Sequence, residues 1–403
     1  MKEIFYLGAL LLTFKAGAQT PAFSVADSLY AVGAYSKAIM TYEAKPNLSA
    51  KDFLNVARSY KGLGNRAAAL EYYQESCTAD PNLVIASVEF GKLSITTKKY
   101  AQADSIFSNL LERYPDNPEF YYQKGVALSK LKVDPTKLVD SAQAIKLPKQ
   151  LARESFAKAV QLDSSHQKAI YQLARNILTK EKKFPEVEKL CFKALESAPE
   201  NVEIIGLLAQ SFYYREFFRD AAKQFERLLE LGQESLFIYE KLGLCYENKR
   251  EYEKAIPNFE AVIQKYDDEN LLAHSRLANC YLRIRDLKKA ESYAQIALFL
   301  ADNSIENEYY GLAQVYDVKQ EYGKAIKYYS NTLSENTDRI DAAYGKVVAA
   351  DKYYKDKAAI IKGYEKFFTD YENDGRISWY HHLLDKRISA LKEELFFEED
   401  KDD

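Results

Sequence analysis

Residues 242–262, with the sequence LGLCYENKREYEKAIPNFEAV, bring together side chains that can do chemistry. Cys245 offers a thiol, Glu247 and Glu251 offer carboxylates, and Lys254 offers an amine. In one site these groups would suit nucleophilic catalysis assisted by an acid or a base. The same stretch also suits one copy of a structural repeat, in which these residue types recur at fixed intervals. The spacing of residues along the rest of the chain distinguishes the two interpretations.

Motifs for catalysis or metal binding are scarce elsewhere. His381 and His382 are adjacent in a stretch that favours helix, where neighbouring side chains point about 100° apart and do not readily share a metal ion. The sequence has no Gly-rich phosphate loop, no H-E-x-x-H helix and no Ser-His-Asp order. A formal net charge of −3 gives no general attraction to nucleic acid. We therefore predict a protein that is not an enzyme and has no cofactor, metal site or nucleic-acid partner.

The first 18 residues, MKEIFYLGALLLTFKAGA, have the pattern of a secretory signal peptide. A short charged start precedes an apolar run from Ile4 to Phe14, and cleavage after Ala18 would leave Gln19 as the first residue. This run is too short to cross a bilayer, which needs about 20 residues. The alternative is a buried N-terminal helix. The pattern predicts an exported protein, in the periplasm or cell envelope, with no membrane span in its mature form.

An exported protein can contain disulfides. The four cysteines, Cys77, Cys191, Cys245 and Cys280, have no spacing typical of metal ligands. We expect them to be small buried side chains. Cys245 and Cys280 occupy equivalent places in neighbouring repeats, so a disulfide between them stays open.

Internal repetition explains the opening stretch. Leu242, Gly243, Tyr246, Ala255 and Phe259 recur, as the same or similar residue types, at shifts of 34 or 35 residues. The first three lie on one face of a helix, and the other two lie on one face of a second helix. One such helix pair cannot bury both of its faces, so the units must stack. The equivalent residues are Leu208, Ala209, Phe212, Ala221 and Phe225; Leu277, Ala278, Tyr281, Ala290 and Ala294; and Leu312, Ala313, Tyr316, Ala325 and Tyr329.

This pattern resembles the tetratricopeptide repeat family over residues 20–372, although no unit has the Trp of the family motif W-x₂-L-G-x₂-Y. The resemblance implies an all-α fold, an α-α superhelix (solenoid) of about ten helix pairs, assigned to residues 19–372. It also implies binding of peptides or protein segments on the concave side, and no enzymatic activity.

Two regions depart from the regular spacing. The interval from Ala103 to Ala152 is 49 residues, which places an insert at about 131–150, where Pro135 and Pro148 would bracket a short extra helix. This insert is either a tolerated loop or a projection that contacts a partner. Residues 377–397, which include Trp379, predict a helix that caps the last repeat. Residues 398–403 predict a disordered acidic tail.

Candidate binding residues are those that the repeat packing leaves free. On each first helix, positions i, i+4 and i+7 form a second stripe, which by family resemblance lines the concave groove. The early rows are basic, the middle is rich in tyrosine and the late rows are acidic, so we expect a bipolar groove that holds an extended or helical segment. The alternative is an ordinary solvated face. The candidates are Arg58, Lys61, Lys92, Tyr122, Tyr171, Arg175, Gln210, Tyr213, Glu240, Leu244, Glu247, Asn279, Tyr310, Gln314 and Asp317.

The sequence therefore predicts an exported scaffold that binds protein or peptide segments and supports a cell-envelope complex. One alternative is a regulatory or catalytic protein with an unrecognised site. Another is a structural solenoid that associates with itself. The oligomeric state and the partner stay open at this stage.

Overall fold

The computed structural model describes residues 25–132, 141–302 and 305–402, so the predicted signal peptide lies outside the described residues. Within these ranges the chain forms 21 α-helices and one π-helical turn, with no strand, which confirms the all-α helical-repeat fold. The elements are α1 Val25–Ala31, α2 Tyr35–Glu43, α3 Ala50–Gly62, α4 Arg66–Ala79, α5 Val84–Thr96, α6 Tyr100–Arg113, α7 Pro118–Lys130, α8 Ser141–Leu162, α9 Gln167–Asn176, η2 Ile177–Glu181, α10 Phe184–Ser197, α11 Val202–Tyr214, α12 Phe218–Glu230, α13 Leu236–Asn248, α14 Tyr252–Lys265, α15 Leu271–Arg283, α16 Leu287–Leu300, α17 Glu306–Val318, α18 Tyr322–Glu335, α19 Ile340–Tyr353, α20 Lys357–Asp370 and α21 Ile377–Asp402.

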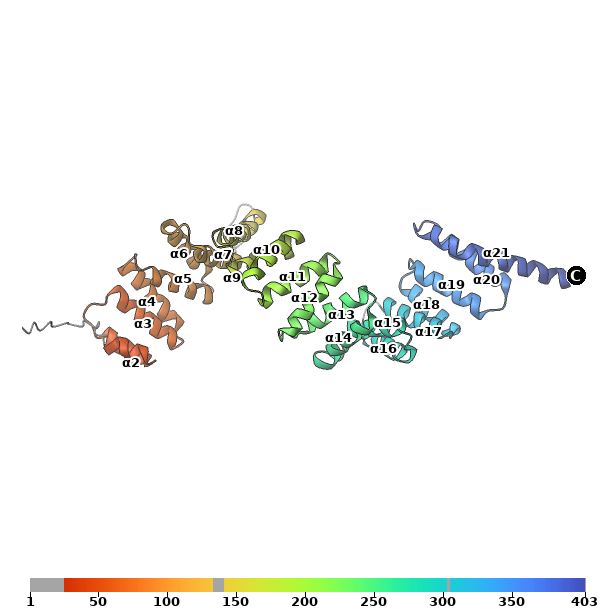
Figure 1. Ribbon diagram of the computed structural model, residues 1–403, viewed down its shortest axis with the longest axis horizontal. Coiled ribbons are helices and arrows are strands. Elements are labelled where there is room, and N and C mark those ends of the chain that lie inside the picture. Colours follow the sequence, from red (N-terminus) through yellow and green to blue (C-terminus); the bar gives the residue numbers. More distant parts are fainter. Residues whose placement is uncertain (1–24, 133–140, 303–304, 403) are drawn as a thin grey trace, which may run out of the picture. The chain divides into compact units, whose positions relative to one another are not determined.

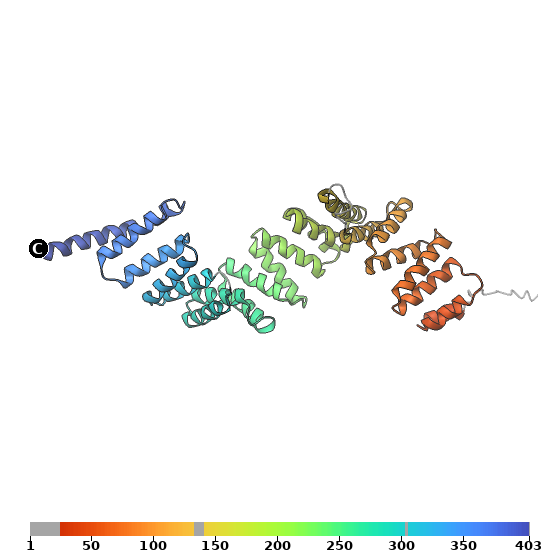
Figure 2. The same ribbon diagram turned by 180° about the vertical axis from the view of Figure 1, so that it is seen from behind.

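The helices belong to two compact units, Met1–Leu173 and Ala174–Asp403. Within each unit, consecutive helices form antiparallel pairs, such as α3 with α4 and α13 with α14, and each pair packs on the next (Figures 1 and 2). None of the described helices combines the length and apolar character that a membrane span needs.

Several helix pairs are held at close range by a small residue facing an aromatic ring. A Cβ added to Gly243 in α13 would lie 2.8 Å from Phe259 in α14, so the ring occupies the space that any larger residue would need. Gly91 faces Phe107 in the same way. Phe259 and Phe107 are completely buried. The Gly on the first helix and the Phe on the second helix of the sequence repeat therefore pack directly against each other.

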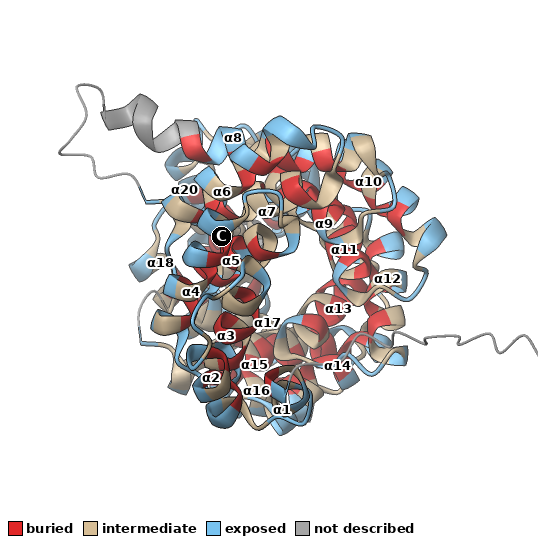
Figure 3. Cartoon of the chain, turned by 90° about the vertical axis from the view of Figure 1, so that its left-hand side faces the viewer, coloured by how far each residue is buried: buried red, intermediate tan, exposed pale blue. Residues whose placement is uncertain are grey.

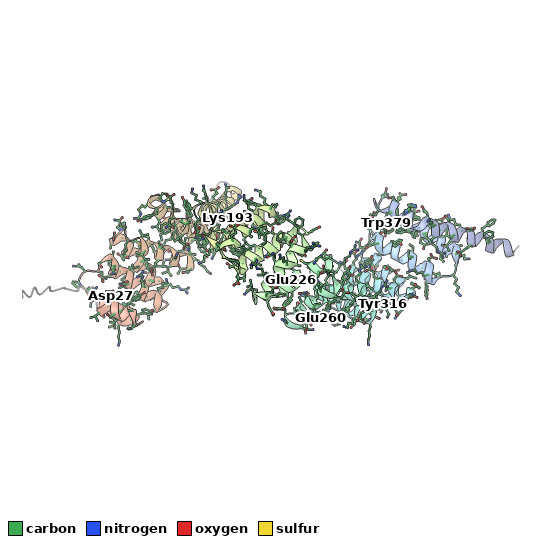
Figure 4. All side chains as sticks on the ribbon, viewed as in Figure 1. Asp27, Lys193, Glu226, Glu260, Tyr316 and Trp379 are labelled. Carbon is green, nitrogen blue, oxygen red and sulfur yellow. The ribbon has the colours of Figure 1, made fainter. Side chains whose placement is uncertain are left out.

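The tyrosine of the repeat connects neighbouring pairs as well as filling the core. The hydroxyl of Tyr281 in α15 donates a hydrogen bond to Glu260 in α14 at 2.8 Å. The hydroxyl of Tyr316 in α17 donates to Glu291 in α16 at 2.7 Å. Tyr246 likewise bonds Glu226, and Figure 4 places Glu226, Glu260 and Tyr316 on successive parts of the second unit. Burial and the acceptor carboxylate raise the pKa of Tyr281 above its ordinary value. The ring packs in the core while the hydroxyl keeps a hydrogen-bond acceptor, a combination that tyrosine can provide at this position.

The turn inside most helix pairs has the same backbone conformation. One residue of the turn has a positive φ, and only two of these turn residues, Gly33 and Gly64, are glycines. After α13, the amide of Arg250 bonds the carbonyl of Glu247, and the amide of Glu251 bonds the carbonyl of Tyr246. These bonds satisfy the last helical carbonyls, as a Schellman ending does. The other turn residues with positive φ are Lys98, Lys182, Glu216, Arg250, Arg285 and Gln320.

All four cysteines are free thiols, so the disulfide left open between Cys245 and Cys280 is absent. Burial raises the pKa of Cys245 to about 12, and it does the same for Cys280 and Cys191. A thiol of this kind is almost wholly protonated at neutral pH and is a poor nucleophile. Cys245 is therefore poorly suited to act as the nucleophile that a catalytic interpretation of residues 242–262 would need.

The insert differs from the short separate helix that Pro135 and Pro148 would bracket. Residues 141–150 are the start of α8, which runs continuously to Leu162, with Pro148 inside it. Pro135 lies outside the described residues. In its described part, the insert therefore lengthens the second helix of a pair. Proline removes one backbone donor, but the remaining bonds of a helix of 22 residues hold that helix together.

The last helix, α21, covers the end of the second unit. Its Tyr380, Leu384 and Leu391 are buried against residues of α19 and α20. Arg387 in α21 donates two hydrogen bonds of 2.8 Å to Asp351 in α19. Trp379 is 58% exposed and lies outside this contact (Figure 4). The helix continues to Asp402, through residues predicted as a disordered tail, because nothing in EEDKDD interrupts an established helix.

The glycine–aromatic contact gives a stability prediction. Gly243→Ala places a methyl group against Phe259, and we expect the overpacking, about 1–3 kcal/mol, to exceed the gain in helix propensity of about 1 kcal/mol. Gly206→Ala is the matched control, because nothing lies within 4 Å of a Cβ at Gly206. Urea unfolding should show a loss of stability for the first variant and a gain for the second. Equal changes in both would contradict the close-contact explanation.

Candidate binding surface

In the second unit, the first helices of the pairs face the inner side of its curve and the second helices face outward (Figure 3). A hollow of about 600 Å³ lies among α15, α17 and the start of α19. Among its lining residues are Ser275, Asn279, Leu282, Tyr310 and Gln314, all of which belong to the stripe. Five positions of the predicted stripe therefore surround one concavity in this part of the chain.

A second hollow of about 270 Å³ shares Leu282 and Gln314 with the first. It also contains Asp317 from the stripe. Because two lining residues are common to both hollows, the two form one continuous surface along α15 and α17.

The walls of the larger hollow are partly fixed by internal hydrogen bonds. Arg339 lies over the ring of Tyr310, 4.2 Å from its centroid, and donates to Glu306 at 2.6 Å and Asn307 at 2.8 Å. Ser275 donates to Glu308 at 3.3 Å. Burial and the nearby Asp341 raise the pKa of Tyr310 to about 12, so this hydroxyl stays neutral. These groups form a preorganised wall and do not need to rearrange before binding.

Two lining side chains are left for a ligand. The carboxamide of Gln314 makes no hydrogen bond with any described residue, so its donors and its acceptor are available. Arg276 is 43% exposed and lies 3.5 Å from Glu247, too long for a well-formed hydrogen bond. A carboxamide and a guanidinium can together bind backbone amides and carboxylates.

The structure changes the expectation of an acidic late groove. Glu247 is only 9% exposed, and Asn279 donates to it at 2.6 Å. Glu240 pairs with Lys241 at 3.0 Å, and Asp317 lies 3.5 Å from Lys352. Internal cations and donors therefore compensate the carboxylates that the sequence placed on the ligand-facing side. Leu244 is 8% exposed and belongs mainly to the core.

In the first unit, the predicted basic rows are also partly used by the fold. Arg58 in α3 makes a bidentate ion pair with Glu89 in α5, at 3.0 and 3.1 Å from its Nε, and Tyr73 donates to the same carboxylate. Lys92 pairs with Glu119 at 3.0 Å. Lys61 is exposed and makes no ion pair within the described ranges. Arg58 is therefore a packing residue, whereas Lys61 remains a candidate.

The other predicted residues are placed as follows. The ring of Tyr122 lies 5.2 Å from that of His166, and Tyr171 is half-buried. In the second unit, Arg175 is exposed and forms no ion pair with a described residue. Gln210 donates to the backbone carbonyl of Gly206 at 3.1 Å, and the ring of Tyr213 lies beneath Lys241.

Sequence reasoning missed the arginines of the surface. Arg276, Arg283, Arg285 and Arg339 line the two hollows, but none lies on the i, i+4, i+7 stripe. A signal was present, because Arg276 and Arg283 are seven residues apart on α15 and so lie on one side of that helix.

The histidines show no metal-binding arrangement. His381 stacks on Phe368, with ring centroids 3.7 Å apart, and His274 bonds the carbonyl of Asp268 at 2.8 Å. In the described part of the chain, no three His, Cys, Asp or Glu side chains gather in a way that could hold a metal ion.

Stacked antiparallel helix pairs define a helical-repeat protein. Residues 207–269 and 241–305 match one family model of the tetratricopeptide repeat, and residues 53–83 match another. Together with the repeat along the chain, these matches make the chain a member of the tetratricopeptide repeat family.

Several solved structures are similar at low identity. YrrB, a TPR protein with an unusual peptide-binding site, is 18% identical with a TM-score of 0.44, over 48% of this chain and 98% of YrrB. PilW, a type IV pilus biogenesis factor, is 15% identical with a TM-score of 0.43, over 53% of this chain and 97% of PilW. A tetratricopeptide repeat protein from Parabacteroides merdae is 13% identical with a TM-score of 0.43, over 66% of this chain and 98% of that protein. Likenesses this distant concern the fold and say nothing about function.

The Arg58–Glu89 pair gives a prediction about stability and pH. We expect Arg58→Gln to lower the free energy of unfolding by about 2 kcal/mol at pH 7, because it leaves a half-buried carboxylate without its charged donor. Burial alone would raise the pKa of Glu89, but the hydrogen bonds from Arg58 and Tyr73 lower it below its ordinary 4.5. A lowered pKa means that the stabilisation is complete above pH 4.5 and is lost as the pH falls through the folded value.

Denaturant unfolding between pH 3 and pH 7 checks this expectation. The difference between the wild type and Arg58→Gln should shrink below pH 4.5. Lys61→Gln removes a nearby exposed charge and should leave stability nearly unchanged. A similar loss in both variants would show that general charge, and not the pair, is responsible.

Proposed function

We propose that this chain is an exported scaffold that binds protein segments along the inner side of its second unit and supports a cell-envelope complex. The observation that carries the proposal is the pair of joined hollows along α15 and α17, whose lining includes polar side chains that the fold does not use. Burying such groups against a partner lets them form hydrogen bonds that they lack in the free protein.

The size and composition of the surface fit a peptide better than a small reactant. A hollow of about 600 Å³ accepts two or three side chains, and a second hollow continues it along the helices. Leu271, Leu272 and Val315 supply apolar contact, and Gln314 supplies backbone-like hydrogen bonding. An extended segment presents both kinds of group at regular intervals.

Support for export comes from the N-terminal sequence. The charged start, the apolar run and the small residues before Gln19 together have the pattern that signal peptidases recognise. Free thiols at all four cysteines are compatible with an exported protein, because each is at least partly shielded by burial.

Site-specific crosslinking in cells tests the binding surface. A photo-crosslinking amino acid at Gln314 should capture a discrete partner protein, because this side chain lies in both hollows. The same amino acid at Lys288, exposed on the outward helix α16, is the matched control. Equal yields at the two positions, or a crosslink only to another copy of the chain, would argue against a partner-binding groove.

Fractionation of a bacterial host tests export. We expect the chain in the periplasmic fraction with Gln19 as its first residue, because the signal peptide is removed during translocation. Deletion of residues 2–18 should leave the protein in the cytoplasm. Wild-type protein that remains cytoplasmic and starts at Met1 would overturn the export part of the proposal.

A further inference from the structure

We propose that the joined hollows of α15 and α17 bind an acidic protein segment, in which a side-chain carboxylate pairs with Arg276 and an apolar side chain packs beside Leu282. This inference rests on the proposed function and adds the chemistry of the partner. It reverses the charge preference that the sequence stripe gave for this half of the chain.

The lining of the joined hollows is positively charged. Four arginines, Arg276, Arg283, Arg285 and Arg339, line the hollows, against two carboxylates, Glu308 and Asp317. The lining therefore has a formal charge of +2, on a chain whose formal net charge is −3. A local positive surface attracts acidic partners, even on a protein whose net charge is negative.

The carboxylates near this surface already have partners within the protein. Glu308 accepts a hydrogen bond from Ser275, and Asp317 lies 3.5 Å from Lys352. Glu306 and Asp341 both pair with Arg339. These pairs leave the three arginines of α15 and its following turn as the cations whose charge the surroundings compensate least.

The donors of Arg276 are largely unused in the free protein. Its guanidinium forms no hydrogen bond with a described residue, and its one ion-pair contact is the 3.5 Å approach to Glu247. Asn279 already donates to the same oxygen of Glu247 at 2.6 Å, so that oxygen keeps a donor when Arg276 turns toward a ligand. Arg283 donates from Nε to Asn279 at 3.3 Å and makes no ion pair within the described ranges. A bound carboxylate would gain bidentate bonds that the free protein lacks.

Apolar space lies beside these donors. Leu271, Leu272, Leu282 and Val315 line the same hollow as Arg276. Gly311 also lines it, and nothing lies within 4 Å of a Cβ built there. The open space over Gly311 lets a ligand approach the backbone of α17 closely. The site therefore selects a segment in which a carboxylate and an apolar side chain are close together.

Fluorescence anisotropy with labelled peptides tests the proposal. The probes are three nine-residue peptides with amidated C-termini, in which Leu alternates with Glu, with Gln or with Lys. The mature full-length chain should bind the Glu peptide at least tenfold more tightly than the Gln peptide, and the Lys peptide least. High salt should reduce this preference, because the arginines are exposed to solvent.

Matched variants assign the preference to the hollows. Arg276→Gln should remove the preference for Glu over Gln, whereas Lys288→Gln, on the outward helix, should keep it. Gly311→Leu should fill the hollow and weaken binding of the Glu peptide at least tenfold. Gly206→Leu adds the same side chain at another open helical glycine, outside the hollows, and should leave binding unchanged.

Two results would overturn the proposal. These are equal binding of the three peptides and a preference that survives in Arg276→Gln. If Gln314 still captures a partner in cells while the peptide preference fails, the binding function stands and only its acidic specificity is wrong. If both fail, the proposed binding surface itself is wrong.

Discussion

The close approach of paired helices at a small residue is the constraint on which the rest of the structure depends. Gly243 and Phe259 meet at a distance that excludes even a methyl group, and other pairs of helices have equivalent contacts. Such contacts hold the two helices of a pair close together, so the first helices are brought into line along one side of each unit. The larger of the two joined hollows lies between the neighbouring first helices α15 and α17, and not within any one pair.

Packing and ion pairs use most of the polar residues near the inner side, and this sets what remains for binding. Glu247 is buried, Asp317 has a lysine nearby, and Arg58 in the other unit is held by Glu89. The surface is therefore not defined by which charged residues are present, but by which ones the fold leaves uncompensated. Because the acidic residues of the stripe are compensated by internal partners more fully than several of the arginines are, the lining of the hollows is positive.

The fold could be predicted from the sequence because the same pattern recurs many times, so an ambiguous assignment in one unit is resolved by the others. One unit with Leu, Gly and Tyr at helical spacing is weak evidence, but the same frame at steps of 34 or 35 residues is strong evidence. The stripe also predicted Asn279, Tyr310 and Gln314, which do line the hollow. The stripe did not predict which charged side chains are available to a ligand. Arg58 and Glu89, for example, are 31 residues apart, and their contact depends on how one helix pair packs on the next. The stripe missed Arg276 and Arg339 because a stripe follows one helix at a time, whereas a hollow is shared by several.

The turns with positive φ have a consequence for how the chain changes over evolutionary time. Arg250, Arg285 and Gln320 have the same conformation at intervals of 35 residues, although they differ in side chain. A segment that begins in one of these turns and ends in the next therefore has ends of matching geometry. Unequal recombination between such points would add or remove a whole helix pair without requiring a new turn. The hollows would then be lengthened or shortened in whole units, which gives this architecture a simple route to partners of different length.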